Sequence, residues 1–264
     1  MAGSTLSIVT PSYNQADFIE ECIQSVHEQV YEDIEHIVVD GGSTDGTVEL
    51  LERYETKYDL RWVSEPDEGQ AAAINKGIRM AGGDWIGWQN SDDFYLPGAF
   101  EIFAETRHQH PDADVIYGDI DVVNKDGKNL RRLYQTRPSK LTHRYWSMFA
   151  RNQGTFFARR IVDTVGYLDE DIEFAMDADY FWRILQANLD LVNVPEALGA
   201  FRIQENAKTY KRTHEFWEHE YREIYPQTFS DQIIPSSLLK ASGMAIKGIN
   251  LVRDGRWGAL WSRF

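Results

Sequence analysis

Two adjacent carboxylates, Asp92 and Asp93, lie a few residues after a short apolar run at residues 85–88. Neighbouring like charges repel, so one of them takes up a proton unless a cation compensates both. Carboxylate oxygens are hard ligands that select Mg²⁺ or Mn²⁺, and such an ion can hold substrate phosphates. The pair therefore indicates a divalent metal site. The alternative is a solvated turn that caps a helix beginning near Pro97.

A second pair of carboxylates, Asp177 and Asp179, lies in the otherwise apolar stretch 174–183. Burial in an apolar pocket raises the pKa of a carboxylic acid toward the working pH, which is what a general base needs. Both residues could instead lie at the start of a helix, near the positive end of its dipole. The two roles can coexist.

The elements that must position these side chains alternate between strand and helix in the first hundred residues. Strands are predicted at 6–10, 34–39, 60–63 and 85–88, and helices at 18–26, 48–58 and 70–80. We expect Asp17 and Glu20 to form a capping box at the start of the first helix. Strands separated by roughly 10–15 helical residues predict a parallel sheet with right-handed crossovers, so the fold class is α/β.

In such a sheet, ligands bind outside the carboxyl ends of the strands. Polar residues collect at four of these ends, namely 10–14, Asp40, 64–67 and the Asp92-Asp93 pair. Asp40 could accept a hydrogen bond from a ligand, although its place before two glycines favours bracing that turn. Together the four ends predict one ligand-binding crevice.

In the second half of the chain, the predicted strands and helices no longer alternate regularly. Strands are predicted at 115–117, 120–124, 155–157, 191–194 and 198–203, a hairpin turn at 125–128, and helices at 177–187 and 213–224, the last stopped by Pro226. This order predicts a mixed sheet. No linker is evident before about residue 226, so we expect one domain over 1–226, followed by a separate segment over 227–264.

Composition limits the possible functions. The 264 residues include 27 Lys and Arg against 42 Asp and Glu, a net charge of −15, which argues against a nucleic-acid partner. At 42% apolar residues the chain can bury a full core. The single cysteine, Cys22, excludes an internal disulfide framework and a cysteine zinc site. Without a signal-peptide pattern or an apolar run of about 18 residues, we expect a cytoplasmic protein, soluble or peripheral on the membrane.

Charge is uneven along the chain. Residues 232–264 carry five basic residues and one acidic residue, a net charge of +4, so the rest of the chain carries −15 − 4 = −19. This segment also contains Trp, Leu and Phe, which together with basic residues are typical of an interfacial membrane helix. The alternative is a helix docked on the domain, although four glycines would weaken a long continuous helix.

Motifs of several rival chemistries are absent from the sequence. There is no Gly-x-Gly-x-x-Gly, P-loop, Gly-x-Ser-x-Gly or His-Glu-x-x-His pattern. A dinucleotide-binding dehydrogenase, a P-loop nucleotidase, a serine hydrolase and a zinc hydrolase are therefore disfavoured. A ligand-binding module without catalysis remains open at this point.

Three blocks in this order carry a family resemblance: residues 7–14 (SIVTPSYN), 37–47 (IVVDGGSTDGT) and 90–93 (NSDD). The sequence resembles a family 2 glycosyltransferase of the GT-A fold over roughly residues 5–205. Residues 67–77 (DEGQAAAINKG) further resemble the bacterial branch that builds O-antigen and other surface polysaccharides. The resemblance implies a Rossmann-like nucleotide-binding half followed by a mixed acceptor-side half.

The resemblance also implies roles for particular residues. On the donor side, Thr10, Pro11 and Tyr13 would line the nucleotide base and ribose, and Asp40 would read the uracil N–H, which makes a UDP-sugar the expected donor. Asp92 and Asp93 would hold Mn²⁺ or Mg²⁺ on the diphosphate. Asp177 would be the general base of an inverting transfer. Gln70, Asn75 and Lys76 would lie near the donor, and Gln153, Asp179, Trp182 and Arg202 on the acceptor or diphosphate side.

Two positions depart from the family pattern. Asn90 replaces the first Asp of the Asp-x-Asp motif and brings no charge, so metal affinity is expected to be lower. Gln204 replaces the histidine of an Arg-x-His motif, which leaves Arg202 to meet the diphosphate or acceptor.

The expected acceptor is a saccharide, on a polyprenyl diphosphate if the basic segment keeps the enzyme at the cytoplasmic membrane face. Two other functions are weighed against this transferase. The first is a sugar-phosphate nucleotidyltransferase, which shares the α/β sheet and acidic metal site. The second is a non-catalytic sugar-nucleotide-binding protein.

Overall fold

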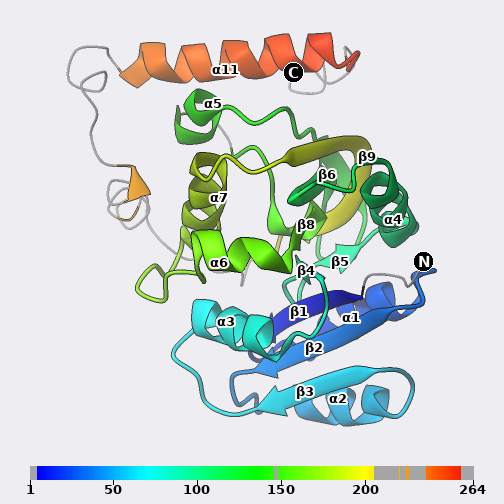
Figure 1. The fold of residues 1–264 in the computed structure, drawn as a ribbon. Helices are drawn as coiled ribbons and strands as arrows, with labels where there is room; N and C mark the ends of the chain where they lie inside the picture. The colour runs from blue at the N-terminus through cyan, green and yellow to red at the C-terminus, as the bar shows by residue number, and fades with distance from the viewer. Residues whose placement is uncertain (1–4, 146–147, 205–219, 221–223, 226–235, 257–264) are drawn as a thin grey trace.

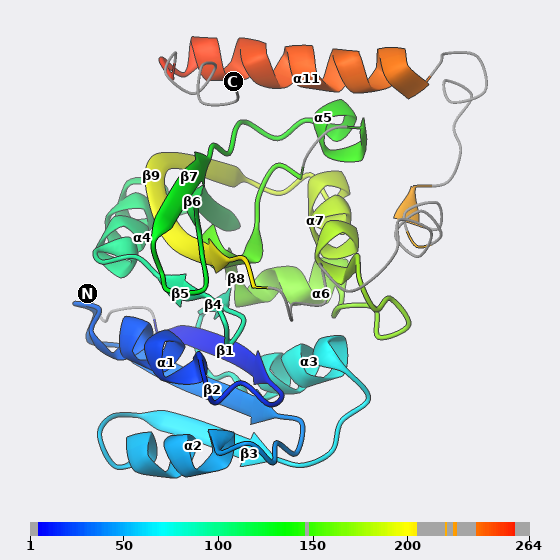
Figure 2. The same ribbon diagram turned by 180° about the vertical axis from the view of Figure 1, so that it is seen from behind.

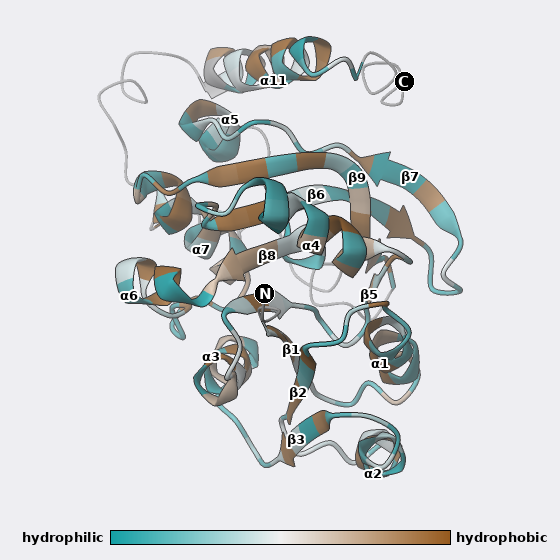
Figure 3. Ribbon diagram, turned by 45° about the vertical axis from the view of Figure 1, so that its right-hand side comes forward, coloured by the Kyte–Doolittle hydropathy of each residue, from teal (hydrophilic) through white to brown (hydrophobic). Residues whose placement is uncertain are grey.

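The computed structural model describes residues 5–145, 148–204, 220, 224–225 and 236–256. The first half alternates strand and helix as predicted: β1 (Leu6–Ser12), α1 (Ile19–His27), β2 (Ile34–Asp40), α2 (Thr47–Glu55), β3 (Leu60–Ser64), α3 (Gln70–Met80) and β4 (Trp85–Trp88). These strands pair in parallel in the order β3-β2-β1-β4 (Figure 1). Figure 3 shows α3 on one face of the strands and α1 and α2 on the other. Because both faces are covered, β1 is buried at every position.

The start of α1 differs from the prediction of a capping box. The helix begins after Phe18, and no side chain caps its first turn. Glu20 instead accepts a hydrogen bond from the Tyr54 hydroxyl of α2 at 2.9 Å. The Glu20 carboxylate, which the sequence pattern assigned with Asp17 to a capping box, therefore makes a contact between α1 and α2 instead.

The second half continues the same sheet with mixed strand directions, as predicted. It contains β5 (Phe94–Tyr95), α4 (Ala99–Gln109), β6 (Val115–Val123), β7 (Asn129–Leu133), α5 (Lys140–Tyr145), β8 (Thr155–Ala158), α6 (Val162–Val165), α7 (Met176–Gln186), β9 (Leu191–Arg202) and α11 (Ser236–Arg253). Strand β8 runs antiparallel to β4 and β6, and β9 runs parallel to β6. The β4–β8 pairing joins the two halves into one sheet within the described residues.

Two predicted breaks between strands are wrong. The sequence predicts separate strands at 115–117 and 120–124, and again at 191–194 and 198–203, whereas β6 and β9 each run through. Their pairing continues across the gaps with shifts of register near Asp119. A Cβ atom on Gly118 would lie 2.6 Å from the Glu196 carbonyl oxygen, so the strands approach closely where the residue types suggested a break. The helix predicted at 213–224 falls largely outside the described residues.

Another close backbone approach positions the turn at Asn152–Gly154, which precedes β8. A Cβ atom on Gly199 would lie 1.9 Å from the Gln153 carbonyl oxygen. No side chain fits in that space, so glycine at this position of β9 lets the turn lie directly against the strand. Gln153 is thereby fixed beside the end of β4.

Helix α11 lies across the end of the molecule opposite β3 and α2, with α5 between it and the sheet (Figures 1 and 2). It continues through Gly243 and Gly248 and ends in a Schellman motif at Gly255, whose φ is +74°. There the N–H groups of Gly255 and Arg256 donate to the carbonyl oxygens of Val252 and Leu251 at 3.1 and 2.8 Å. Among the described residues, no helix combines the length and apolar character needed to cross a lipid bilayer.

Candidate active site

A pocket of about 530 Å³ opens at the carboxyl ends of β1 and β4. Its walls come from the loop after β1, the loop before α3, the loop after β4 and the end of β9, with Tyr13, Asp67, Gln70, Asp92 and Gln204 among the lining residues. Three of the four strand ends expected to form a crevice thus meet around one cavity. The fourth, at Asp40, does not line it.

The two carboxylates of the acidic pair point into different surroundings. Asp92 lines the pocket and accepts a hydrogen bond from the Gln204 side-chain amide at 2.7 Å. Asp93 is only 1% exposed and accepts hydrogen bonds from Gln153 Nε2 at 2.7 Å and from the Arg202 backbone N–H at 2.8 Å. Asp92 is therefore the member that can meet a ligand, while Asp93 holds the turn.

Burial raises the pKa of both carboxyl groups. For Asp93 the neighbouring charge of Asp92 raises the pKa further, whereas the Gln204 hydrogen bond and the charge of Arg202 lower that of Asp92. A desolvated pair of this kind favours a shared proton or a bound cation. The site thus fits a divalent ion that is held by one or two carboxylates and completed by substrate phosphates and water.

Within the described residues, no group of three or more His, Cys, Asp or Glu side chains is placed to hold a metal ion. One carboxylate ligand is missing because Asn90 stands where the Asp-x-Asp motif has its first Asp. Its side-chain oxygen accepts hydrogen bonds from Gln70 Nε2 at 2.9 Å and Trp88 Nε1 at 3.0 Å, and its nitrogen donates to Asp93 at 3.3 Å. Asn90 is therefore used to fix the loop and not to add a charge.

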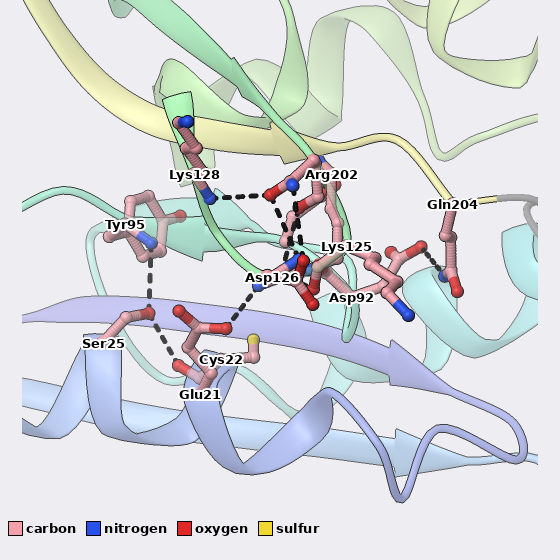
Figure 4. A network of polar contacts seen from close by, with 12 residues as sticks. Glu21, Cys22, Ser25, Asp92, Tyr95, Lys125, Asp126, Lys128, Arg202 and Gln204 are labelled. Carbon is pink, nitrogen blue, oxygen red and sulfur yellow. Dashed lines mark hydrogen bonds and ion pairs between the residues drawn. The ribbon is translucent and has the colours of Figure 1, made fainter. Parts of the chain in front are cut away.

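The Arg202 guanidinium lies inside the molecule, with its side chain 2% exposed. Its Nε donates to the Asp92 carbonyl oxygen at 2.8 Å, Nη1 donates to the Lys125 carbonyl oxygen at 2.6 Å, and Nη2 pairs with Glu21 of α1. Figure 4 shows these contacts, with Gln204 beside Asp92. Protein acceptors surround the cation in this arrangement, so these contacts lend no support to the predicted contact of Arg202 with diphosphate or acceptor, which stays a prediction.

Two residues expected at the nucleotide have other partners. The Thr10 hydroxyl is buried and hydrogen-bonded to His36 Nε2 at 2.9 Å, so its side chain turns away from the pocket. Asp40 is fully buried and accepts hydrogen bonds from the Ser43 N–H at 2.8 Å, the Ser43 hydroxyl and the Ser64 hydroxyl at 2.6 Å. In this arrangement Asp40 has the turn-bracing role. Pro11 and Tyr13 do line the pocket.

Helix α3 brings Gln70 and Ala73, both in its first turn, to the pocket. Gln70 lines it, whereas Asn75 donates to the Leu168 carbonyl oxygen at 2.9 Å and to Glu170 at 2.7 Å, and accepts from the Leu168 N–H. Lys76 pairs with Glu65. Neither Asn75 nor Lys76 lines the pocket, because the helix carries them to other partners, so their predicted place near the donor stays a prediction.

Asp177 is the second residue of α7 and accepts a hydrogen bond from the Ala178 N–H at 2.8 Å. Burial raises its pKa, and the nearby positive charge of Arg151 lowers it. Burial also lowers the pKa of Arg151, and Asp177 opposes that effect. Arg151 directly precedes the turn that carries Gln153, so this short segment adjoins both Asp177 and the acidic pair. The sequence analysis did not single out Arg151. The only indication in the sequence was that Arg151 lies two residues before the candidate Gln153.

The two remaining candidates on α7 have structural partners. Asp179 pairs with Arg183 one turn further along the helix, at 2.8 Å. Trp182 packs edge-on against Tyr225, with ring centroids 5.1 Å apart, and lies near His143. The expected place of Asp179 and Trp182 on the acceptor side is not supported by these contacts. On this helix, Asp177 remains the candidate for chemistry.

The fold with this pocket defines a class of protein. The structure matches S. aureus TarS 1-349 in complex with UDP-GlcNAc with a TM-score of 0.68 and 17% identity, over 91% of this chain and 71% of that one. It matches the mannosyltransferase PcManGT from Pyrobaculum calidifontis, in complex with GDP-Man and Mn²⁺, with a TM-score of 0.63 and 17% identity, over 93% and 74% of the two chains. The chain therefore has the GT-A fold of glycosyltransferases.

The model of Glycosyl transferase family 2 matches residues 7–168, and the chain belongs to this family. Chondroitin synthase from Pasteurella multocida (strain Pm70) is 31% identical over 180 residues, which cover 68% of this chain and 18% of that protein. The uncharacterized glycosyltransferase EpsJ from Bacillus subtilis (strain 168) is 29% identical over 221 residues, covering 77% and 62%. This chain thus spans less than a fifth of that chondroitin synthase and less than two thirds of EpsJ.

The buried position of Arg202 predicts a large loss of stability in Arg202→Ala. The substitution leaves the Asp92 and Lys125 carbonyl oxygens without their donor, which costs about 1–3 kcal/mol of unfolding free energy for each buried group, and urea denaturation measures this loss. Arg160→Ala is the control, because Arg160 is 55% exposed in its pair with Asp114 and should cost no more than about 1 kcal/mol. Equal midpoints for the two variants would contradict the structural role of Arg202.

Proposed function

We propose that this protein transfers a hexose or N-acetylhexosamine from a UDP-sugar to a hydroxyl of a saccharide acceptor in the synthesis of a surface polysaccharide. The observation that carries the proposal is the pocket that joins the exposed ring of Tyr13 to the desolvated carboxylate of Asp92. The relatives support it, since one is a chondroitin synthase and TarS was solved with UDP and with UDP-GlcNAc. GDP is the competing nucleotide, because PcManGT was solved with GDP-Man.

The donor would lie between the loop after β1 and the loop after β4. Tyr13, which is 61% exposed, and Pro11 would pack on the nucleoside. Asp92 would hold Mn²⁺ or Mg²⁺ against the diphosphate, with Gln204 orienting its carboxylate and Asp93 acting through the turn. When bound, the ion would offset the negative charge that develops on the departing UDP.

Asp177 would act as the general base. It would take the proton of the acceptor hydroxyl while that oxygen bonds to the anomeric carbon from the face opposite UDP. The bond from this carbon to the UDP oxygen breaks at the same time, so UDP leaves with the bonding electrons and the configuration inverts. Burial raises the pKa of Asp177, which strengthens it as a base, and the positive charge of Arg151 opposes that rise.

A saccharide on a polyprenyl diphosphate would suit this enzyme as acceptor. The net charge of +4 over residues 232–264, together with Trp257 and Trp261, favours work at the cytoplasmic face of a membrane, where basic segments are attracted to anionic lipid.

The role of Asp177 predicts a loss of turnover without a loss of donor binding. In Asp177→Asn, release of UDP from a UDP-sugar should fall by roughly 10²–10⁴, the range expected when a general base is lost. The affinity for UDP, measured by calorimetry, should stay near that of the wild type. Asp179→Asn is the matched control, because Asp179 lies on the same helical turn but pairs with Arg183.

Retained turnover in Asp177→Asn, or an equal loss in Asp179→Asn, would exclude this assignment of the base. Release of pyrophosphate in place of UDP would establish a nucleotidyltransferase. Binding of UDP-sugars with no turnover by the wild type would establish a binding protein.

The positive charge of Arg151 near Asp177 predicts the direction of a pH effect. A base works only when deprotonated, so kcat/KM should rise with pH through the pKa of Asp177, above the ordinary aspartate value because burial raises it. Arg151→Met removes the positive charge that lowers this pKa, so the rise should move to higher pH. The remote variant Arg160→Met should leave the profile in place. If the pH profile of kcat/KM in Arg151→Met matched that of the wild type, Arg151 would not influence the pKa of the base.

A further inference from the structure

Helix α11 has one face against the molecule and one face open. On the closed side, Gly243, Lys247 and Leu251 recur every four residues and are buried, with Lys247 and Leu251 only 5% and 3% exposed. The Thr142 hydroxyl of α5 donates to the Gly243 carbonyl oxygen at 3.4 Å. This spacing keeps a single stripe of the helix in contact with the body.

The end of the helix is fixed to the body by charge. Arg256 Nη1 donates to Asp119 at 2.9 Å and to the Gln135 carbonyl oxygen at 2.6 Å, and Asp119 is 1% exposed in this pair. Asp254 accepts a hydrogen bond from Arg137 at 3.0 Å. The orientation of α11 about its own axis is thereby set, and the same residues always face outward.

The outward side is apolar. Leu238 is 58% exposed, Met244 48% and Ile249 64%, so three of the seven large hydrophobic side chains exposed in the described part of the chain lie on this one helix. Ala241 and Ala245 are exposed between them. Leu238, Ala241, Ala245 and Ile249 follow helical spacing and form one stripe, which we name the outer stripe.

The charges on α11 are all positive. Arg253 is exposed beside the outer stripe, one turn after Ile249, whereas Lys240 is exposed near the first turn on the side of the helix that carries Gly243, and no acidic residue occurs between 236 and 253 in a chain that has 42 of them. The residues outside 232–264 carry a net charge of −19 and would be repelled by an anionic surface. Helix α11 thus combines exposed apolar side chains with positive charge, and Figures 1 and 2 show it at the edge of the molecule, with α5 between it and the sheet.

We propose that the outer stripe of α11 is a docking surface for an anionic lipid bilayer. Leu238 and Ile249 would enter the boundary between headgroups and acyl chains, while Arg253, one turn after Ile249, meets lipid phosphates and the charge of Lys240 adds to the positive potential of the helix. This deepens the proposed function by naming the surface that would bring the enzyme to a lipid-linked acceptor. Vesicle binding is measured without turnover, so a failure of one proposal is distinguishable from a failure of the other.

The test is co-sedimentation of the full chain with vesicles of phosphatidylglycerol and phosphatidylcholine, and with vesicles of phosphatidylcholine alone. The wild type should bind the anionic vesicles, and added salt should weaken that binding. The double variant Leu238→Asp/Ile249→Asp should lower the partition coefficient by about tenfold or more, because it removes apolar insertion and adds negative charge. Val30→Asp is the control, since Val30 is 74% exposed outside α11 and should keep wild-type binding.

Calorimetry with UDP and a thermal melt establish that each variant is folded. Equal vesicle binding by the double variant and the wild type, or no binding by the wild type, would overturn the proposal. A self-association of the wild type that the double variant abolishes, seen by sedimentation velocity without vesicles, would assign the stripe to a second copy instead and would also overturn it.

Discussion

The buried guanidinium of Arg202 is the interaction on which the candidate site depends. Removing a cation from water costs several kcal/mol, and only a surrounding set of acceptors offsets that cost. Here the acceptors come from α1, from the loop after β4 and from the β6–β7 hairpin, and the rings of Phe18 and Phe94 flank the cation at 5.2 and 5.3 Å. Segments that are distant in sequence are therefore held as one unit, and Arg202 supports the pocket from behind instead of binding substrate in it.

The position of Arg202 also gives the two residues of the acidic pair different roles. The Arg202 backbone N–H and Gln153 hold Asp93 inward, which leaves Asp92 at the pocket with Gln204. Burial raises the pKa of both carboxyl groups, so the folded protein holds a pair of acids that a cation would stabilise. Since few protein ligands surround Asp92, the diphosphate itself would complete the coordination, and metal and donor would bind cooperatively.

The sequence predicts the repeated features well and the individual side-chain partners poorly. Alternating apolar runs located the parallel strands, and loops at their carboxyl ends located the pocket, because backbone periodicity determines both. The side chains of Thr10 and Asn75 are hydrogen-bonded to His36 and to the segment at Leu168, partners that are distant in sequence. The same holds for Arg202, since the Lys125 carbonyl oxygen that it binds is 77 residues away. Local spacing cannot supply such partners.

The central claim, that the pocket at Asp92 holds a UDP-sugar through a divalent ion, is tested most directly by titration calorimetry with UDP, GDP and CDP. Each nucleotide is titrated with Mn²⁺ and again with chelator, into the wild type and into Asp92→Asn. The account predicts that UDP binds best, that chelator weakens its binding, and that Asp92→Asn removes the difference made by the metal. Preference for GDP, or equal UDP binding with metal and with chelator, would contradict it.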